Sequence, residues 1–340
     1  MIKRELKNLG IKPIEELSVQ EKTNIAEKVA AKLVSLNVPG VMHNEILENL
    51  FDAKMYTAQM SNNIGKVYYF SKNKSIYFEQ NINLKNLDEN IMCGCIQYLQ
   101  DKREKSEKIT RKGISIIEKY KVTGRALNEI AVSYLSKKLL DVEDKSKTGI
   151  LLRQISLVTG EKAFFDTILN SNNTFEEKFI KQTNSAVLYS KVQNSFDLII
   201  DLEQIIKRLN SDGRKSANAQ KYLSKINMHK NTVTSKFSEM QWEIYNRYFS
   251  RKIELIEKTE EIKQYKDELF YYNELLEISG DESRYTNFVN EKFKILKEIE
   301  LQISKNEENA MTIVENGRIS KIIRSIKKML FKSSEYESNM

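Results

Sequence analysis

The segment 90–100 of this 340-residue chain carries residues at the spacing of a metal site on a helix. Cys93 and Gln97 are four positions apart, so a helix would project both side chains from one face. Two histidines at these positions would bind Zn²⁺, and a glutamate directly after the first would activate a bound water molecule. The chain has Cys93, Gly94 and Gln97 instead. The spacing therefore indicates the frame of a metal site without its ligands or its general base.

The residues that occupy this frame offer little coordination chemistry. Cys93 would bind zinc only as a thiolate, and the neutral amide of Gln97 suits harder ions than zinc. Cys95 would point about 200° around the helix from Cys93, toward the opposite face. Gly94 has no side chain that could act as a base, and a glycine within a helix costs about 1 kcal/mol relative to alanine. Because nothing structural in the sequence calls for this glycine, we interpret it either as relaxed selection or as a small residue admitted where a large carboxylate once filled the cleft. We expect no bound cofactor.

Four stretches of the chain resemble a family of clostridial proteins that carry a His-Glu-x-x-His helix and are similar to zincin-type zinc metallopeptidases. These stretches are KVYYFSKNKSIYF (66–78), NLDENIMCGCIQYLQ (86–100), GRALNEIAVSYLSK (124–137) and LVTGEKAFFDTILNSNNTFEEKF (157–179). The resemblance implies a zincin-like fold, zinc in the active relatives and a degenerate motif in this chain. On this basis Cys93 and Gln97 are vestigial ligand positions, and Gly94 is the vestigial position of the base.

The same resemblance assigns a role to Glu129, which lies in a helix predicted to begin at Gly124. The pair Asn128-Glu129 is similar to the Asn-Glu pair of the gluzincins, in which the glutamate is the third zinc ligand. Glu129 is then a third vestigial ligand position, and the alternative is an ordinary glutamate on a helix surface. The only histidines, His43 and His229, have no partner at metal-binding spacing.

A β-hairpin is predicted over residues 66–78. Two aromatic and β-branched runs, VYYF and SIYF, flank the polar segment SKNK. The resemblance implies that this hairpin corresponds to the edge strand on which zincins lay an extended peptide. The expected peptide-binding edge consists of Ser75, Ile76, Tyr77 and Phe78.

The remaining patterns predict helices. A capping box at Ser18 and Glu21 starts a helix over 18–36, and further helices are expected over 42–52, 88–103 and 148–169. From residue 174 onward the chain is predicted to be entirely helical. We therefore expect a mainly α protein (α+β) with a zincin-like N-terminal half that contains a small sheet, followed by a bundle of long helices. The predicted domains are 1–175, 176–317 and 318–340.

The last predicted helix, residues 318–332, is basic and amphipathic. Six positive charges and no acidic residue accompany an apolar stripe in this span. Such a helix could lie on an anionic membrane or fill a groove of a partner, whereas the alternative is a last helix that packs on the bundle. The residues expected to make this contact are Ile319, Ile322, Ile323, Ile326, Lys327, Lys328 and Leu330.

Composition excludes several classes of protein. The formal net charge is +8, but the lysines are interleaved with acidic residues, and no recognition motif accompanies them, so nucleic acid is not an expected partner. The two cysteines are only two positions apart and form a poor disulfide pair. No apolar run reaches the roughly 18 residues of a membrane span, and no secretory signal is recognisable. We expect a cytoplasmic protein, with peripheral membrane attachment as an option.

These observations support three hypotheses of function. The first is a catalytically inactive homologue of zinc metallopeptidases that binds a peptide or a protein in its former cleft and has a binding or regulatory role. The second is an enzyme in which Cys93 acts as metal ligand or nucleophile near Glu129, or a peptidase whose site has been silenced by substitution. The third is a helical interaction protein, or one that binds a membrane surface, in which the former site has no part.

Overall fold

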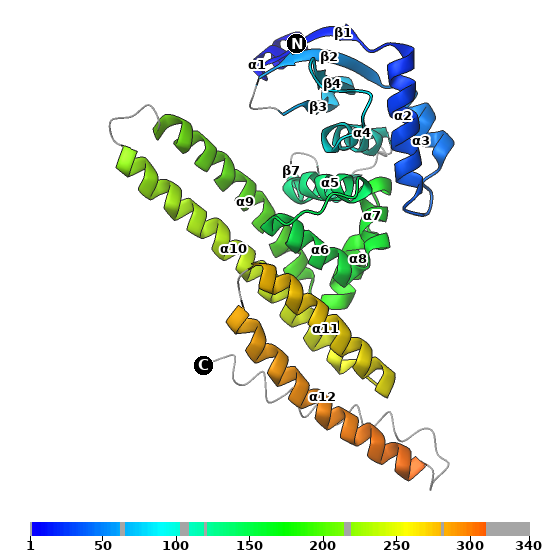
Figure 1. Ribbon diagram of the computed structural model, residues 1–340, viewed down its shortest axis with the longest axis vertical. Coiled ribbons are helices and arrows are strands. Elements are labelled where there is room, and N and C mark those ends of the chain that lie inside the picture. The colour runs from blue at the N-terminus through cyan, green and yellow to red at the C-terminus, as the bar shows by residue number, and fades with distance from the viewer. Residues whose placement is uncertain are drawn as a thin grey trace. The chain divides into compact units, whose positions relative to one another are not determined.

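The computed structural model describes residues 2–61, 65–102, 109–118, 121–213, 219–279 and 282–310. Within these residues the chain is mainly helical with two small sheets, which confirms the predicted α+β class (Figure 1). It divides into two units, the first made of Met1–Lys181 and Ser185–Met240 and the second of Gln182–Asn184 and Gln241–Met340. The boundary predicted at residue 175 lies within the first unit.

The elements of the N-terminal part alternate between short helices and strands. In chain order they are α1 (Ile2–Asn8), β1 (Ile11–Glu16), α2 (Val19–Val34), α3 (His43–Phe51), β2 (Lys54–Met60), β3 (Val67–Phe70), the 3₁₀ turn η1 (Ser71–Asn73), β4 (Ser75–Glu79), α4 (Glu89–Lys102), β5 (Ile109–Lys112), β6 (Ser115–Glu118) and β7 (Lys121–Thr123). Only helices follow: α5 (Arg125–Leu139), α6 (Lys147–Thr159), α7 (Glu161–Asn170), α8 (Thr174–Thr183), α9 (Ala186–Gly213), α10 (Ala219–Glu254), α11 (Thr259–Ser279) and α12 (Glu282–Ala310).

The larger sheet has the strand order β1-β2-β4-β3. β2 and β4 are parallel, whereas β1 pairs with β2 and β3 pairs with β4 in antiparallel fashion. The predicted hairpin is confirmed as β3 and β4. The expected edge is wrong, however, because β4 pairs on both sides and Ser75, Ile76, Tyr77 and Phe78 are all buried. The edge strands of this sheet are β1 and β3.

The two faces of this sheet are covered by different helices. Side chains alternate between the faces, so Val67 and Ile76 lie on one face and Tyr77 on the other. Val67 and Ile76 face α4, which lies below the sheet in Figure 1. On the opposite face Leu6 of α1 packs in a hydrophobic cluster with Ile11, Ala58, Phe70 and Tyr77. The sheet is therefore a middle layer between a long helix and a short one.

Helix boundaries follow the capping residues that the sequence offers. Ser18 and Glu21 form the predicted capping box at the start of α2, with the Ser18 backbone N–H donating to the Glu21 carboxylate at 2.9 Å. Gly124 precedes α5 as expected, and Asp197 of α9 accepts a hydrogen bond of 3.1 Å from the Ala126 N–H in the first turn of α5. This contact fixes α5 against α9, although Asp197 lies 71 positions after Ala126 in the chain.

The described part of the second unit is entirely helical and has an aromatic core. Tyr245 lies at its centre, with ring centroids 4.9 Å from Phe249, 5.0 Å from Tyr285 and 4.9 Å from Phe288. The basic segment 318–332 falls outside the described residues, so its role at a membrane or a partner stays a prediction. Over the part of the chain that the structure covers, no helix combines the length and the apolar character that crossing a membrane requires.

Candidate functional site

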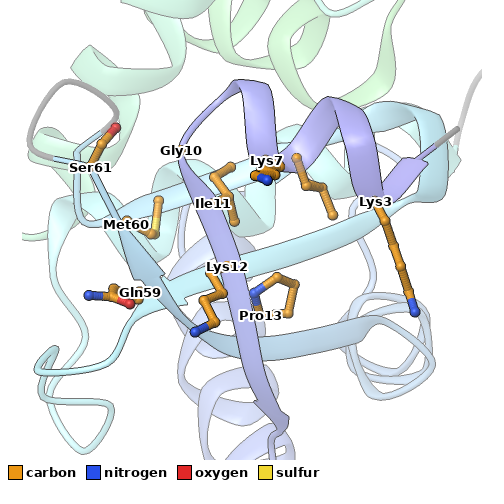
Figure 2. Close-up of a pocket in the computed structure, with 10 residues that line it drawn as sticks. Lys3, Lys7, Gly10, Ile11, Lys12, Pro13, Gln59, Met60 and Ser61 are labelled. Atoms are coloured by element: carbon orange, nitrogen blue, oxygen red, sulfur yellow. The ribbon is translucent and has the colours of Figure 1, made fainter.

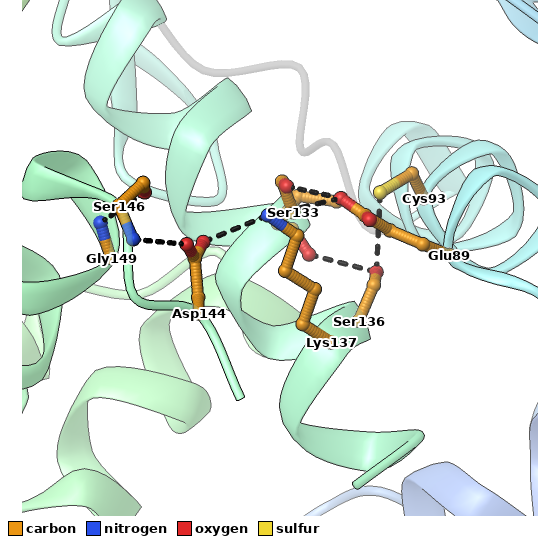
Figure 3. Close-up of polar contacts among 9 residues, drawn as sticks. Glu89, Cys93, Ser133, Ser136, Lys137, Asp144, Ser146 and Gly149 are labelled. Atoms are coloured by element: carbon orange, nitrogen blue, oxygen red, sulfur yellow. Dashed lines mark hydrogen bonds and ion pairs between the residues drawn. The ribbon is translucent and has the colours of Figure 1, made fainter. Parts of the chain in front are cut away.

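The predicted site lies where α4 packs against α5 and against the hairpin β3–β4. Cys93 near the start of α4 contacts Ser136 near the end of α5, and Gln100 contacts Asn128 at the opposite ends of both helices. The two helices are therefore antiparallel along this seam. Figure 3 shows the end of the seam where the side chains of Cys93 and Glu89 approach α5. Cys93, Gly94, Gln97 and Glu129 are all carried by these two helices, as the sequence predicts.

Gly94 lies at the closest contact between α4 and the hairpin. A Cβ atom added to this residue would lie 2.7 Å from Val67 Cγ1 and 3.3 Å from Ile76 Cγ2. The shorter of these distances is far inside van der Waals contact, so a side chain on residue 94 would have to displace Val67. The contact gives the glycine a structural reason, so relaxed selection is not needed to explain it. The glycine has a packing role that becomes visible only when the partner strand is known.

The Cys93 thiol is held in a protonated state. Its Sγ donates a hydrogen bond of 3.3 Å to Ser136 Oγ, which in turn donates to the Val132 carbonyl at 2.8 Å (Figure 3). Burial raises the pKa of Cys93 to about 11, and the hydrogen bond to Ser136 offsets this only in part. Cys95 lies on the buried side of α4, where burial raises its pKa to about 12. Both cysteines are free thiols.

A network of charged side chains closes the end of the seam beside Cys93. Ser133 donates a hydrogen bond of 2.6 Å to Glu89, and the Lys137 ammonium lies 2.8 Å from Asp144 and 3.8 Å from Glu89 (Figure 3). Burial lowers the pKa of Lys137, but its bond to Asp144 and the charge of Glu89 outweigh burial and raise it overall. The Glu89 carboxylate beside Cys93 is therefore already engaged by Ser133 and Lys137 of α5.

Asn128 has a structural role that the sequence pattern does not identify. Its side chain exchanges hydrogen bonds with the buried Gln100, at 3.1 and 3.3 Å, and its Oδ1 accepts a bond of 2.9 Å from the Ile114 N–H. Gln100 also donates to the Ile168 carbonyl at 2.7 Å. Gly113 has φ +56°, and a Cβ atom there would lie 2.1 Å from Asn128 Oδ1. The amide pair thus fixes the β5–β6 turn against α4, α5 and α7.

Glu129, next to Asn128, lies about 100° further around α5, on an exposed side of the helix. Its carboxylate pairs with Arg125 at 3.4 Å and borders a small cavity of about 190 Å³ that Asp197 and Asp201 also line. Burial raises the pKa of Glu129, while the charge of Arg125 lowers it. Gln97 is half-buried on α4. Among the residues described by the structure, no three His, Cys, Asp or Glu side chains are grouped so that they could hold a metal ion.

The two histidines lie on other elements. His43 is the first residue of α3 and is exposed, whereas His229 is half-buried in α10. Within the described ranges no hydrogen bond or ion pair joins either of them to Cys93. Among the described residues the arrangement therefore offers neither an activated thiol nor a set of metal ligands.

Comparisons of the chain with protein-family models, with curated proteins and with solved structures found no match. The resemblance to zincin-like metallopeptidases therefore stays a prediction. A function for this chain has to be argued from the geometry of the seam between α4, α5 and the hairpin.

Proposed function

We propose that this chain is a catalytically inactive relative of zinc metallopeptidases, and that it acts by binding an extended peptide at the free edge of its larger sheet. The contact between Gly94 and the hairpin is the observation that carries this proposal. In a helix of the His-Glu-x-x-His type, the residue at this position must bring a carboxylate to a metal-bound water. Here even a single carbon at position 94 would lie 2.7 Å from Val67. The frame has no room for the base.

Chemistry based on Cys93 is less well supported. With a pKa of about 11, roughly one molecule in ten thousand carries the thiolate at pH 7. A nucleophilic cysteine needs a neighbouring base or cation that lowers its pKa. The closest polar group is instead the Ser136 hydroxyl, which accepts the thiol proton in a hydrogen bond.

The free edge of β3 supports a peptide-binding role. The Glu79 N–H donates to the Lys66 carbonyl at 2.8 Å. From this pair onward, hydrogen-bonded and non-hydrogen-bonded residue pairs alternate along the antiparallel strands. The backbone groups of Val67 consequently point away from β4. Among the described strands none pairs with this side of β3. An extended peptide could add here as a further strand, directly beside α4.

We further infer that the chain works in a reducing compartment such as the cytoplasm. Cys93 and Cys95 are both free. The proposal does not depend on this location, because strand addition requires only the backbone of β3.

The first experiment measures metal content by mass spectrometry on untagged protein, together with cleavage of a peptide library with and without added zinc. The expected result is no stoichiometric zinc and no cleavage. About one zinc per chain, combined with cleavage that Glu129→Ala abolishes, would overturn the proposal. The triple variant Cys93→His, Gly94→Glu, Gln97→His restores the His-Glu-x-x-His motif on α4 and is the matched control for the lost ligands and base. It is expected to bind zinc only when Val67→Ala is added to make room.

The second experiment measures hydrogen exchange of the amide groups of β3 with and without the same peptide library. Binding at the edge should slow exchange of the Val67 N–H group. The N–H groups of Tyr68 and Phe70 already pair with β4 and serve as internal controls. Peptide binding that leaves Val67 unprotected would exclude β3 as the binding edge.

A further inference from the structure

A second cavity lies at the other edge of the larger sheet, on the face covered by α1. It has a volume of about 820 Å³, which lies within the range of cavities that bind small molecules. Figure 2 shows its lining from α1, from β1 and from the end of β2. It shares no residue with the seam between α4 and α5, so it is independent of the proposed binding of a peptide at β3.

The floor of this cavity is apolar. Leu6 and Ile11 are buried members of the hydrophobic cluster on this face of the sheet, and Met60 packs against the same cluster. Pro13 adds a further apolar surface from β1. Because α1 has only seven residues, it covers part of this face and leaves open space beside it. An alkyl chain is a suitable occupant of such a floor.

The rim of the cavity is positively charged. Lys3 and Lys7 stand one turn apart on α1 (Figure 2). Lys12 alternates with Ile11 along β1 and projects from the opposite side of the strand. Among the described residues no acidic side chain lines the cavity. Within the described residues, none of the three ammonium groups forms an ion pair. The nearby acids have other partners, since Glu5 pairs with Lys72 at 2.7 Å and Glu16 pairs with Lys22 at 2.6 Å.

Strand addition does not explain this cavity. Pro13 lacks an N–H group, and the register of β1 shifts between Pro13 and Glu15. Both features interrupt the backbone groups that a further strand would need, and they are typical of protected sheet edges. The ligand is therefore expected to use the floor and the charges rather than the backbone of β1.

We propose that the cavity lined by Leu6, Ile11, Met60, Lys3 and Lys7 binds a single-chain amphiphilic anion, an alkyl phosphate. The alkyl chain lies on the apolar floor, and the phosphate accepts hydrogen bonds from the two lysines of α1 at the rim. A phosphate monoester fits two ammonium groups better than a carboxylate does, because it carries nearly two negative charges and three acceptor oxygens at pH 7. Lysine binds phosphate well as a point charge.

The test is calorimetric titration of the full chain with decyl phosphate, below the concentration at which it forms micelles. Inorganic phosphate and decyl maltoside, a neutral amphiphile with the same tail, are the ligand controls. Decyl phosphate should bind more tightly than either. Hexyl phosphate should bind more weakly, by up to about fourfold for each methylene group that is lost. Equal binding of decyl phosphate and decyl maltoside, or of decyl phosphate and inorganic phosphate, would overturn the proposal.

Protein variants provide the second arm of this test. The double variant Lys3→Glu, Lys7→Glu should weaken decyl phosphate binding by at least about tenfold, because two favourable charge contacts become repulsive. Both lysines are exposed, so the variant is expected to fold. Lys178→Glu changes an equally exposed lysine on α8 and should leave binding unchanged. Equal loss in both variants, or tighter binding of a poly-glutamate peptide than of decyl phosphate, would overturn the assignment.

Discussion

The two faces of the larger sheet differ in how closely a helix packs against them. On one face α4 approaches so closely that residue 94 must lack a side chain, and the polar groups at its ends are paired with α5. On the other face α1 is short, and a cavity of about 820 Å³ with two lysines of α1 at its rim remains beside it. The face with the motif-like residues is closed, whereas the face without a motif is open.

The difference shows that the residue types at a site do not reveal how closely its surroundings pack. Cys93, Gln97 and Glu129 have the spacing of a site, but Val67 lies where a side chain on residue 94 would begin, and the Cys93 thiol is buried. Lys3 and Lys7 have no motif, yet they line unoccupied volume. Substitutions on each face can test whether the α4 face is closed and whether the α1 face is open.

The largest effect is expected at the amide pair that fixes the far end of the α4–α5 seam. Asn128→Ala leaves the Ile114 N–H and the buried Gln100 side chain without partners, so the free energy of unfolding should fall by about 3 kcal/mol. The neighbouring Glu129→Ala removes only an exposed ion pair and should change it by less than about 0.5 kcal/mol. Urea denaturation followed by circular dichroism measures both. Similar losses for both variants would contradict the assignment of Asn128.

A somewhat smaller effect is expected at the contact of α4 with the hairpin. Gly94→Ala would stabilise an ordinary helix by about 1 kcal/mol, but here it should destabilise the protein by about 2 kcal/mol because the new methyl group collides with Val67. Val67→Ala removes the colliding atoms. The double variant should therefore be more stable than the sum of the single effects predicts, by at least about 1 kcal/mol. A stabilising Gly94→Ala would show that the α4 face is not closed.

Much of the fold is predictable from the sequence where local signals are strong. The capping box at Ser18, the aromatic runs of β3 and β4, and the helices that begin near Asp88 and Gly124 are all encoded within a few residues. The same patterns do not predict β1 and β2. Five of the six residues of β1 are exposed, so its sequence lacks the alternation that identifies a strand. Its pairing with β2 depends on contacts some 45 residues apart, which no local pattern records.

The sequence predicts where the candidate site lies, but not how its residues pack against their neighbours. The sequence correctly puts Cys93 and Glu129 on two helices, and it correctly predicts a hairpin before them. It does not identify which strand of the hairpin is the edge, because that depends on β2 pairing with β4 across the sheet. It also does not show that Gly94 meets Val67, since the distance between a helix and a sheet is a property of packing.

An intermediate effect is expected from the Cys93 thiol at high pH. Burial raises its pKa from an ordinary value of 9.0 to about 11 in the folded protein. Between pH 9 and pH 11 the unfolded chain loses this proton and the folded chain keeps it, so stability falls as the pH rises through that range. Cys93→Ala lacks this contribution. Between pH 8 and pH 10.5, the native chain should therefore lose about 1–2 kcal/mol more than the variant does.

The measurement is the free energy of unfolding at both pH values for both proteins. Cys95 and the buried tyrosines titrate in each of them, so their contributions cancel in the difference. Parallel pH profiles would mean that the thiol is exposed to solvent, and that the α4 face is more open than the structure indicates. Slow alkylation of Cys93 at pH 8, compared with a free cysteine, is the corresponding kinetic result.

The smallest effects on the free energy of unfolding are expected from substitutions of single lysines. One lysine near each face of the sheet allows the two faces to be compared directly. Lys137→Met removes the partner of the mostly buried Asp144, so it should reduce the free energy of unfolding by about 1 kcal/mol. Lys7→Met removes a charge that has no carboxylate partner among the described residues and that repels Lys3. It should leave stability within about 0.5 kcal/mol of the native chain or raise it slightly. If both variants lose the same stability, then Lys7 is engaged in the folded protein, and its ammonium group is not available to an anion in the cavity beside α1.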